Sequence, residues 1–221
     1  MPGSTRASVS GISMQEFLDL ADYRRKVHAI YSGVRDHRIP IEQRWSYWKQ
    51  ARDELIGRHP QSALSPEQRA NFQGLSYYSY DLSLRFLVDV DLDVEPEILE
   101  IPLQEDGDFR MQRIGRVHFL VKGDSVLLSL FRIRSYAGGL FLPFRDASKE
   151  SYPGTRYLID TIKGADLGME RDKLVLDFNF AYNPSCAYDP RWHCPLAPVE
   201  NWLKLPLKSG EKAYPGTSLS G

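Results

Sequence analysis

The chain of 221 residues is predicted to be mainly β, an α+β protein in which two to three N-terminal helices pack on an antiparallel β-sandwich or barrel. Apolar residues recur at helical spacing only in the first third of the chain. About eight short segments of strand character follow, and turn-forming residues separate them. Because strands and helices do not alternate along the sequence, we expect no parallel βαβ unit.

The N-terminal part of the chain is predicted to be a disordered tail followed by a helical segment. Residues 1–12 show no periodic pattern. Ser13-Met-Gln-Glu16 is a capping box, and the apolar spacing after it predicts a helix over about 14–34. Pro40 begins a second helix, which we expect to continue through about Ile56.

Aromatic residues define the packing face of the second predicted helix. Trp45 and Trp48 lie on this face, and Gly57 is expected to end the helix. Ser65-Pro66 begins a third, short helix that ends near Gly74. The helical segment therefore covers residues 13–74.

Residues 75–212 are predicted to form a β-rich domain, and residues 213–221 a loose C-terminal tail. The predicted strands are 82–89, 98–101, 109–114, 115–121, 125–133, 140–142, 156–160 and 174–180. Turn signals between them are Glu105-Asp-Gly107, Lys122-Gly-Asp124, Gly138-Gly139 and Pro153-Gly154.

Composition excludes several classes of function. The net charge of −1 gives no basic field that would attract nucleic acid. Residues 1–12 lack the apolar centre of a signal peptide, and no apolar run approaches the ~18 residues of a membrane helix. We therefore expect a cytoplasmic protein that contacts neither nucleic acid nor membrane. The sequence indicates no particular cofactor and no oligomeric state.

Both cysteines of the chain, Cys186 and Cys194, lie in one proline-rich loop next to His193. They are interpreted as metal ligands with Asp189 or Glu200, as a nucleophile with a histidine base, as a disulfide, or as two small buried thiols. The spacing differs from the paired knuckles of zinc sites, and cytoplasmic cysteines are reduced. We therefore favour two reduced thiols and no metal site.

Polar residues follow the last predicted strand. If that strand continued to residue 180, Asp177 and Asn179 would share one face and Phe178 and Phe180 the other. Arg145 suits a carboxylate or phosphate ligand, or it braces its loop on a carbonyl or on Asp146.

Several blocks of sequence together carry a family resemblance. They are Leu20-Ala-Asp-Tyr-Arg-Arg, Arg52-Asp-Glu-Leu, His59-Pro-Gln-Ser, Leu142-Pro-Phe-Arg-Asp146, Gly154-Thr-Arg-Tyr-Leu158, Asp177-Phe-Asn, Cys186-Ala-Tyr, Cys194-Pro-Leu, Pro198-Val-Glu-Asn201 and Gly210-Glu-Lys. In combination they resemble the bacterial and archaeal family catalogued as domain of unknown function 1684. The chain departs from the family pattern at Pro153 and Thr155, which replace glycines, and at His193, which replaces a small polar residue.

The resemblance implies a shared site but no particular reaction. The matching polar positions and cysteines are Arg145, Asp146, Arg156, Tyr157, Asp177, Asn179, Asn183, Cys186, Cys194, Glu200 and Asn201. We expect the site where the segments 142–158 and 177–201 converge.

The leading hypothesis is a small-molecule-binding protein, or an enzyme, that takes an anionic or carbonyl-bearing ligand. Asp177 and Glu200 are the predicted catalytic residues. The predicted ligand-binding residues are Arg145, Arg156, Tyr157, Asn179, Asn183 and Asn201. The alternative is a non-catalytic scaffold or protein-interaction domain, in which these polar residues brace loops.

Overall fold

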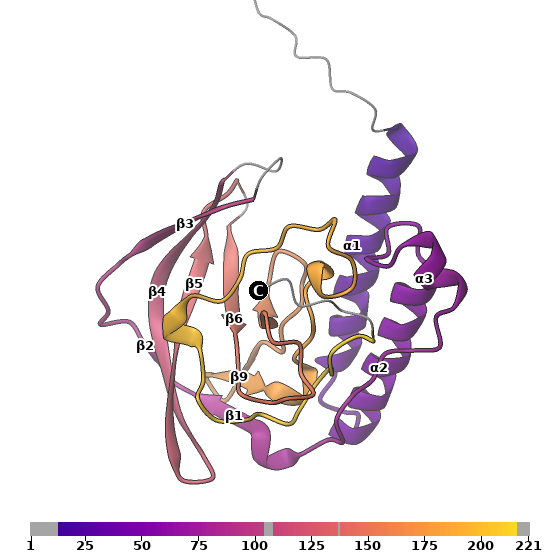
Figure 1. The fold of residues 1–221 in the computed structure, drawn as a ribbon. Coiled ribbons are helices and arrows are strands. Elements are labelled where there is room, and N and C mark those ends of the chain that lie inside the picture. The colour runs from indigo at the N-terminus through magenta and orange to yellow at the C-terminus, as the bar shows by residue number, and fades with distance from the viewer. Residues whose placement is uncertain (1–12, 104–107, 137, 216–221) are drawn as a thin grey trace, which may run out of the picture.

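The computed structural model describes residues 13–103, 108–136 and 138–215, and it confirms the predicted α+β, mainly β class (Figure 1). Helices come first in the chain, and two antiparallel sheets follow. The predicted tail 1–12, the turn at 105–107 and residues 216–221 of the predicted C-terminal tail lie outside the described residues.

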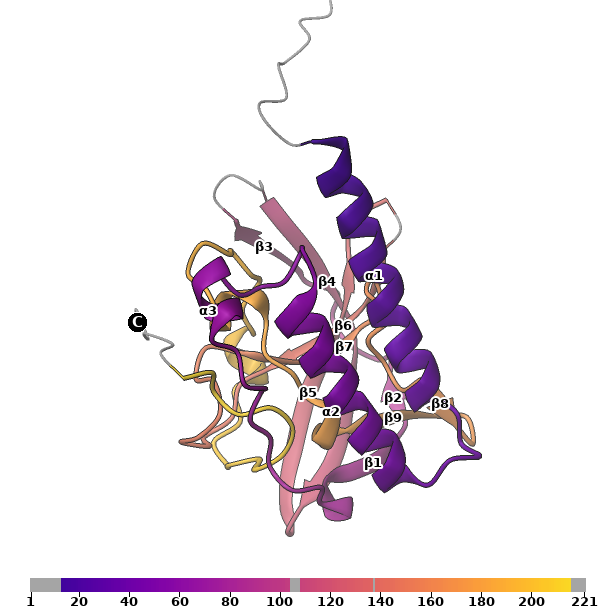
Figure 2. The same ribbon diagram turned by 90° about the vertical axis from the view of Figure 1, so that its right-hand side faces the viewer.

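The helices are α1 (Met14–Val34), α2 (Ile41–Arg58) and α3 (Pro66–Ala70). Figure 2 shows α1 and α2 side by side, with the first turns of α1 extending beyond the rest of the molecule. The predicted capping box begins α1, since the Ser13 hydroxyl accepts the Glu16 N–H and the Glu16 carboxylate accepts the Ser13 N–H. None of the described helices is both long and apolar enough to cross a membrane.

Two helix ends differ from the prediction. Helix α2 continues through Gly57 and ends at Arg58, so the prediction that Gly57 ends it was wrong. Here the glycine serves packing, because a Cβ at this position would lie 2.6 Å from Cδ1 of Phe72. Helix α3 ends at Ala70, before the expected Gly74.

The larger sheet has six strands in the order β2-β4-β5-β6-β7, with β3 also paired to β4, and the smaller sheet has the order β1-β9-β8. Their bounds are β1 (Arg85–Val88), β2 (Val90–Asp91), β3 (Ile98–Pro102), β4 (Asp108–Val121), β5 (Asp124–Ile133), β6 (Gly139–Phe144), β7 (Arg156–Asp160), β8 (Met169–Glu170) and β9 (Lys173–Asp177). Every pair of these strands is antiparallel. As predicted, no βαβ unit occurs in the described chain, and the six-stranded sheet described here does not close into a barrel.

The segments 109–114 and 115–121, expected as separate strands, form the single long strand β4. A bulge between Arg113 and Gly115 shifts its register against β5. Glycine is required there because a Cβ on Gly115 would lie 2.9 Å from the Asp91 carbonyl oxygen.

The strand predicted over 174–180 ends at Asp177, so the alternation expected beyond it was wrong. Residues 178–180 form a 3-10 turn, because the Asp177 carboxylate accepts the Asn179 N–H at 3.0 Å and draws the backbone away from the ladder. Asp81 turns residues 82–84 in the same way, which shortens the strand predicted over 82–89.

Two buried apolar clusters hold these layers together. One lies between the two sheets and includes Phe119, Phe144 and Phe178. The other joins α1 and α2 to the six-stranded sheet, and in it the Trp48 ring contacts Phe180 at 5.3 Å between centroids. The interpretation of the tryptophan face of α2 as packing is thereby confirmed.

The long segment after β9 runs between the helices and the sheets (Figure 1). It is tied to the helical part, since Trp192 Nε1 donates to the Ala63 carbonyl at 2.9 Å and Gln68 Nε2 donates to the Tyr188 carbonyl at 2.7 Å. The segment that carries most of the predicted site residues is therefore fixed against the N-terminal part of the chain, at contacts 129 and 120 positions away in sequence.

Candidate functional site

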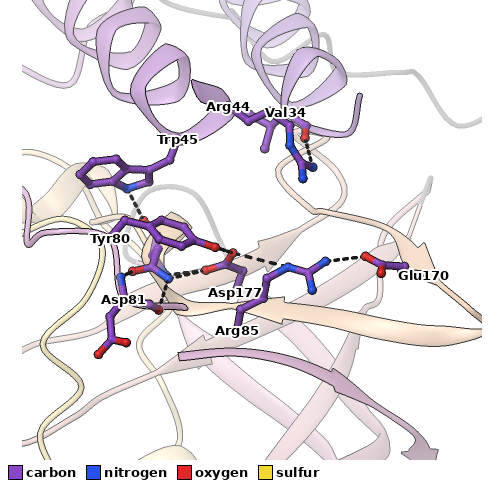
Figure 3. A network of polar contacts seen from close by, with 9 residues as sticks. Val34, Arg44, Trp45, Tyr80, Asp81, Arg85, Glu170 and Asp177 are labelled. Atoms are coloured by element: carbon purple, nitrogen blue, oxygen red, sulfur yellow. Dashed lines mark hydrogen bonds and ion pairs between the residues drawn. The ribbon is translucent and has the colours of Figure 1, made fainter. Parts of the chain in front are cut away.

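Asp177 and Asn179 belong to one buried network of hydrogen bonds. Figure 3 shows Asp177 and Tyr80 of this network below the helix that carries Trp45. The Asp177 carboxylate accepts the Asn179 side-chain N–H at 2.8 Å and the Tyr80 hydroxyl at 3.0 Å. Asn179 also exchanges two 2.8 Å hydrogen bonds with the backbone of Asp81. Trp45 Nε1 donates to the Asn179 carbonyl at 3.3 Å, so the network ties α2 to the start of β1.

Burial raises the pKa of the Asp177 carboxyl group, even though its hydrogen bonds act in the opposite direction. Arg85 lies between Asp177 and Glu170 in Figure 3, and it forms an ion pair with Glu170. Asp177 thus has hydrogen-bond partners on both carboxylate oxygens, all of them from the protein itself.

Arg156 is buried on β7 and is held by protein groups. Its guanidinium forms an ion pair with Asp146 at 2.7 Å, and it donates to the carbonyls of Leu207 and Ser209. The Asp146 carboxylate in turn accepts the Leu207 N–H at 2.7 Å. This pair fixes the C-terminal segment against the sheet.

Asn201 and Arg145 lie beside the central strands β5 and β6 of the same sheet. The fully buried Asn201 side chain accepts the Ser129 N–H at 2.8 Å and donates to the carbonyls of Ser129 and Pro143. The Arg145 guanidinium lies over the Trp202 ring, 4.6 Å from its centroid, and is partly exposed.

Glu200 and Tyr157 occupy two further places. Glu200 forms an ion pair with Arg113, which also binds Glu97 at 2.6 Å. The Tyr157 hydroxyl donates to the Pro195 carbonyl at 2.8 Å and fixes the loop that carries Cys194. The Glu200 side chain thus contacts an arginine of strand β4, whereas the Tyr157 side chain contacts a loop.

The predicted site residues are therefore distributed over several networks. Arg156 and the Asp177–Asn179 pair share no hydrogen-bond partner, and Arg145 stacks on Trp202. None of these four lines the cavity described next. Asn183 is the one predicted residue that does.

A cavity of about 60 Å³ lies among α1, α2 and the loop that follows residue 181. Its lining is rich in tyrosine and carries cationic and amide groups. The polar residues that line it are Tyr23, Tyr31, Arg52, Lys163, Tyr182, Asn183, Ser185 and Tyr188.

A buried ion pair forms one wall of this cavity. Arg52 Nη2 lies 2.7 Å from the Glu211 carboxylate and 3.3 Å from the Tyr188 hydroxyl, which itself donates to Glu211. The Arg52 guanidinium also lies over the Tyr182 ring, 5.0 Å from its centroid. Glu211 accepts the Asn183 N–H at 3.0 Å, so the cavity wall is held from both the helix and the loop.

Several buried polar atoms of the lining have no hydrogen-bond partner among the described residues. Two of them belong to adjacent residues, the Tyr182 hydroxyl and Oδ1 of Asn183. The other end of the Asn183 amide does have a partner, because its Nδ2 donates to the Lys212 carbonyl at 2.7 Å. Arg52 Nε and the Tyr31 hydroxyl also lack a partner of good geometry. Buried polar groups are nearly always hydrogen-bonded, so this concentration in one cavity indicates a site for a polar guest.

The tyrosines around the cavity remain protonated at neutral pH. Burial raises the pKa of Tyr31 to about 12, and it also raises the pKa values of Tyr182 and Tyr188 well above the ordinary value of a tyrosine. The hydroxyl groups of Tyr31 and Tyr182 are therefore available as hydrogen-bond donors, whereas that of Tyr188 donates to Glu211.

Lys163 lines the cavity on its solvent-exposed side. Its side chain is 42% exposed, and its ammonium lies 2.7 Å from Asp160, whose side chain is 5% exposed. Lys163 thus lies where the cavity meets the surface and is neutralised by a fixed carboxylate.

The sequence carried signals for these residues, although it did not assign them a role. Arg52, Tyr188 and Glu211 each belong to a block of the family resemblance, namely Arg52-Asp-Glu-Leu, Cys186-Ala-Tyr and Gly210-Glu-Lys. Only the fold brings these three blocks together, because they come from α2, a loop and the C-terminal segment.

Cys186 and Cys194 are not linked by a disulfide, and both are partly buried. Among the described residues no three His, Cys, Asp or Glu side chains are grouped so that they could hold a metal ion. His193 is exposed beside Cys194.

Comparison with known proteins agrees with the resemblance seen in the sequence. An uncharacterised protein of Haloarcula marismortui, solved by NMR in solution, is 32% identical, with 77% of this chain and 93% of that chain covered and a TM-score of 0.55. No curated protein matches the chain. Residues 70–212 match the family model described as "Protein of unknown function (DUF1684)". The chain therefore belongs to this family of proteins of unknown function.

Proposed function

We propose that the protein binds a small, polar, carbonyl-bearing molecule in the tyrosine-lined cavity between α1, α2 and the loop 182–188. The observation that carries this proposal is the pair of unpartnered buried atoms on adjacent residues, the Tyr182 hydroxyl and Oδ1 of Asn183. Leaving such groups buried without a partner costs about 1–3 kcal/mol each, so a guest that satisfies them gains that free energy on binding.

The donors and acceptors of the lining define the guest. The Tyr31 and Tyr182 hydroxyls and Arg52 Nε are donors without an acceptor among the described residues, which suits the carbonyl oxygen of a guest. Oδ1 of Asn183 only accepts, so the guest needs a hydroxyl or amine of its own. A cavity of about 60 Å³ holds about four water molecules or a compound of similar size.

Charge balance favours an uncharged carbonyl compound over an anion. Arg52 is already neutralised by Glu211, and Lys163 by Asp160. An anion would enter a cavity without net positive charge and would lose its hydration there. A small hydroxy-amide meets these requirements, because it is uncharged, its carbonyl accepts hydrogen bonds, and its hydroxyl and amide N–H groups donate them.

The test compares glycolamide with glycolate, its charged counterpart of the same size. Chemical-shift perturbations in two-dimensional NMR spectra of the ¹⁵N-labelled protein report binding at residues 182–188. We expect glycolamide to shift these signals at lower concentration than glycolate. Tyr182→Phe, which keeps the ring and removes the hydroxyl, should weaken the binding of glycolamide by roughly five- to tenfold, as expected for one lost hydrogen bond.

The matched control is Tyr80→Phe, because the Tyr80 hydroxyl is bound to Asp177 and does not line the cavity. It should leave binding of glycolamide unchanged. If neither compound shifts the signals of residues 182–188, the polar network serves as a brace between helix and loop. The scaffold interpretation then replaces the binding proposal.

A further inference from the structure

The two cysteines of the chain lie in direct contact. The Cys186 N–H donates to Sγ of Cys194 at 3.3 Å, and the Cys186 thiol hydrogen-bonds to the same sulfur. On its other side Sγ of Cys186 lies 3.9 Å from the Tyr152 hydroxyl. The two sulfurs therefore have different surroundings, although they are neighbours.

The donors around Cys194 stabilise its thiolate. The hydrogen bond from the Cys186 thiol lowers the pKa of Cys194 to about 7, and the backbone N–H groups of Cys186 and Ser185 and the charge of Lys163 add to it. The same pairing raises the pKa of Cys186, since its proton is held between the two sulfurs. Cys194 is therefore the more readily ionised of the two thiols.

The loops that carry the pair are fixed from both sides. The Tyr157 hydroxyl holds the Pro195 carbonyl at 2.8 Å, and the Thr155 hydroxyl accepts the Ala197 N–H at 2.7 Å. Cys186 lies in a 3-10 turn next to the cavity-lining Ser185. Both cysteines remain partly exposed, so a small reagent can reach them.

We propose that Cys194 and Cys186 form a dithiol redox pair, in which Cys194 is the attacking thiolate and Cys186 the resolving thiol. A hydroperoxide is the oxidant. The Cys194 sulfur attacks its terminal oxygen, the O–O bond breaks, and the departing alkoxide or hydroxide takes a proton, which leaves a sulfenic acid. The Cys186 sulfur then attacks the Cys194 sulfur, the S–S bond forms, the S–O bond breaks, and hydroxide leaves as water with the Cys186 proton. Two thiols are oxidised by two electrons, and the peroxide is reduced to an alcohol or water.

The experiment uses the reduced full-length protein, freed of reductant and treated with hydrogen peroxide. Intact mass spectrometry should show the loss of two hydrogens, and both cysteines should become inaccessible to iodoacetamide until dithiothreitol is added. In Cys186→Ser the sulfenic acid should persist on Cys194 and be trapped by dimedone. In Cys194→Ser oxidation should slow by about tenfold or more, since an ordinary thiol is only a few per cent ionised at pH 7.

A second measurement does not depend on the variants. Alkylation of the untreated protein, mapped by peptide mass, should modify Cys194 before Cys186, and the rate at Cys194 should reach its half-maximum at a lower pH than that of an ordinary thiol. Equal oxidation rates in the protein and in Cys194→Ser would overturn the proposal. So would over-oxidation to sulfinic acid without any disulfide, or alkylation of Cys186 first. These readouts record the thiol state alone and do not involve a guest in the tyrosine-lined cavity.

Discussion

The Glu211 carboxylate lies 2.7 Å from Nη2 of Arg52, although the two residues are 159 positions apart. The side chains are 1% and 10% exposed, so this is a buried ion pair. The same carboxylate accepts hydrogen bonds from the Tyr188 hydroxyl and the Asn183 N–H. One residue of the C-terminal segment thereby joins helix α2 to the loop that lines the cavity.

Arg52→Met should lower the free energy of unfolding by about 3–5 kcal/mol, because it leaves the buried Glu211 charge without its partner. Urea denaturation followed by circular dichroism measures this. The double variant Arg52→Met with Glu211→Gln should lose less than the sum of the two single variants, since both members of the pair are then uncharged.

The matched control is Arg38→Met. Arg38 also forms an ion pair, with Asp36, but its side chain is 89% exposed, so Arg38→Met should lower the free energy of unfolding far less than Arg52→Met does. If both variants lost the same free energy of unfolding, burial would not determine how much each ion pair contributes to stability.

The two arginines that the sequence placed in one site should behave differently on substitution. Arg156→Met removes a fully buried ion pair with Asp146 and should cost about 3–5 kcal/mol of unfolding free energy. Arg145→Met removes a partly exposed stack on Trp202 and should cost about 1 kcal/mol or less. Thermal and urea unfolding of both variants measure the difference. A loss at Arg145 as large as that at Arg156 would show that Arg145 is also a structural brace.

The contrast between these arginines also shows which structural features can be predicted from the sequence and which cannot. Helix starts, turns and the antiparallel class depend on local chemistry, such as the Ser13–Glu16 capping box and the two-residue turn at Lys122-Gly123, and they could be predicted. Whether Arg156 binds a ligand or Asp146 depends on contacts between distant segments, which no local pattern encodes. The same holds for Asp177, whose carboxylate captures a backbone N–H two residues on and ends the strand in which it was expected to lie.

Gly210 should be among the positions least tolerant of a side chain. Its φ of +70° is in the left-handed region, and a Cβ would lie 2.4 Å from the Ala181 carbonyl oxygen. Gly210→Ala therefore combines backbone strain with a clash against fixed backbone and should cost more than about 3 kcal/mol. The adjacent Glu211 would be displaced with it.

Gly123→Ala is the matched control for this substitution. Gly123 also has a positive φ, +94°, but a Cβ there has nothing within 4 Å. Gly123→Ala should therefore lower the free energy of unfolding only by the cost of backbone strain, about 1–2 kcal/mol. Urea unfolding of the two variants separates the terms, and a Gly210→Ala variant as stable as Gly123→Ala would contradict the close approach to Ala181.

Alkaline pH should destabilise the protein through its buried tyrosines. The pKa of Tyr31 is raised from 10.0 to about 12 because burial disfavours the phenolate. Above pH 10 the unfolded chain therefore releases a proton that the folded protein keeps, so the unfolded state binds fewer protons and stability falls as the pH rises. The contribution of Tyr31 is fully present below pH 10 and is lost between about pH 10 and pH 12. A shift of about two units corresponds to on the order of 3 kcal/mol.

Tyr31→Phe should remove this part of the slope when unfolding free energies are measured from pH 8.5 to 11.5. Tyr136→Phe is the control, because Tyr136 is fully exposed in the folded protein and its removal should leave the slope unchanged. Identical slopes for the protein and Tyr31→Phe would mean that Tyr31 ionises without unfolding, and its hydroxyl would then not be buried in the cavity wall.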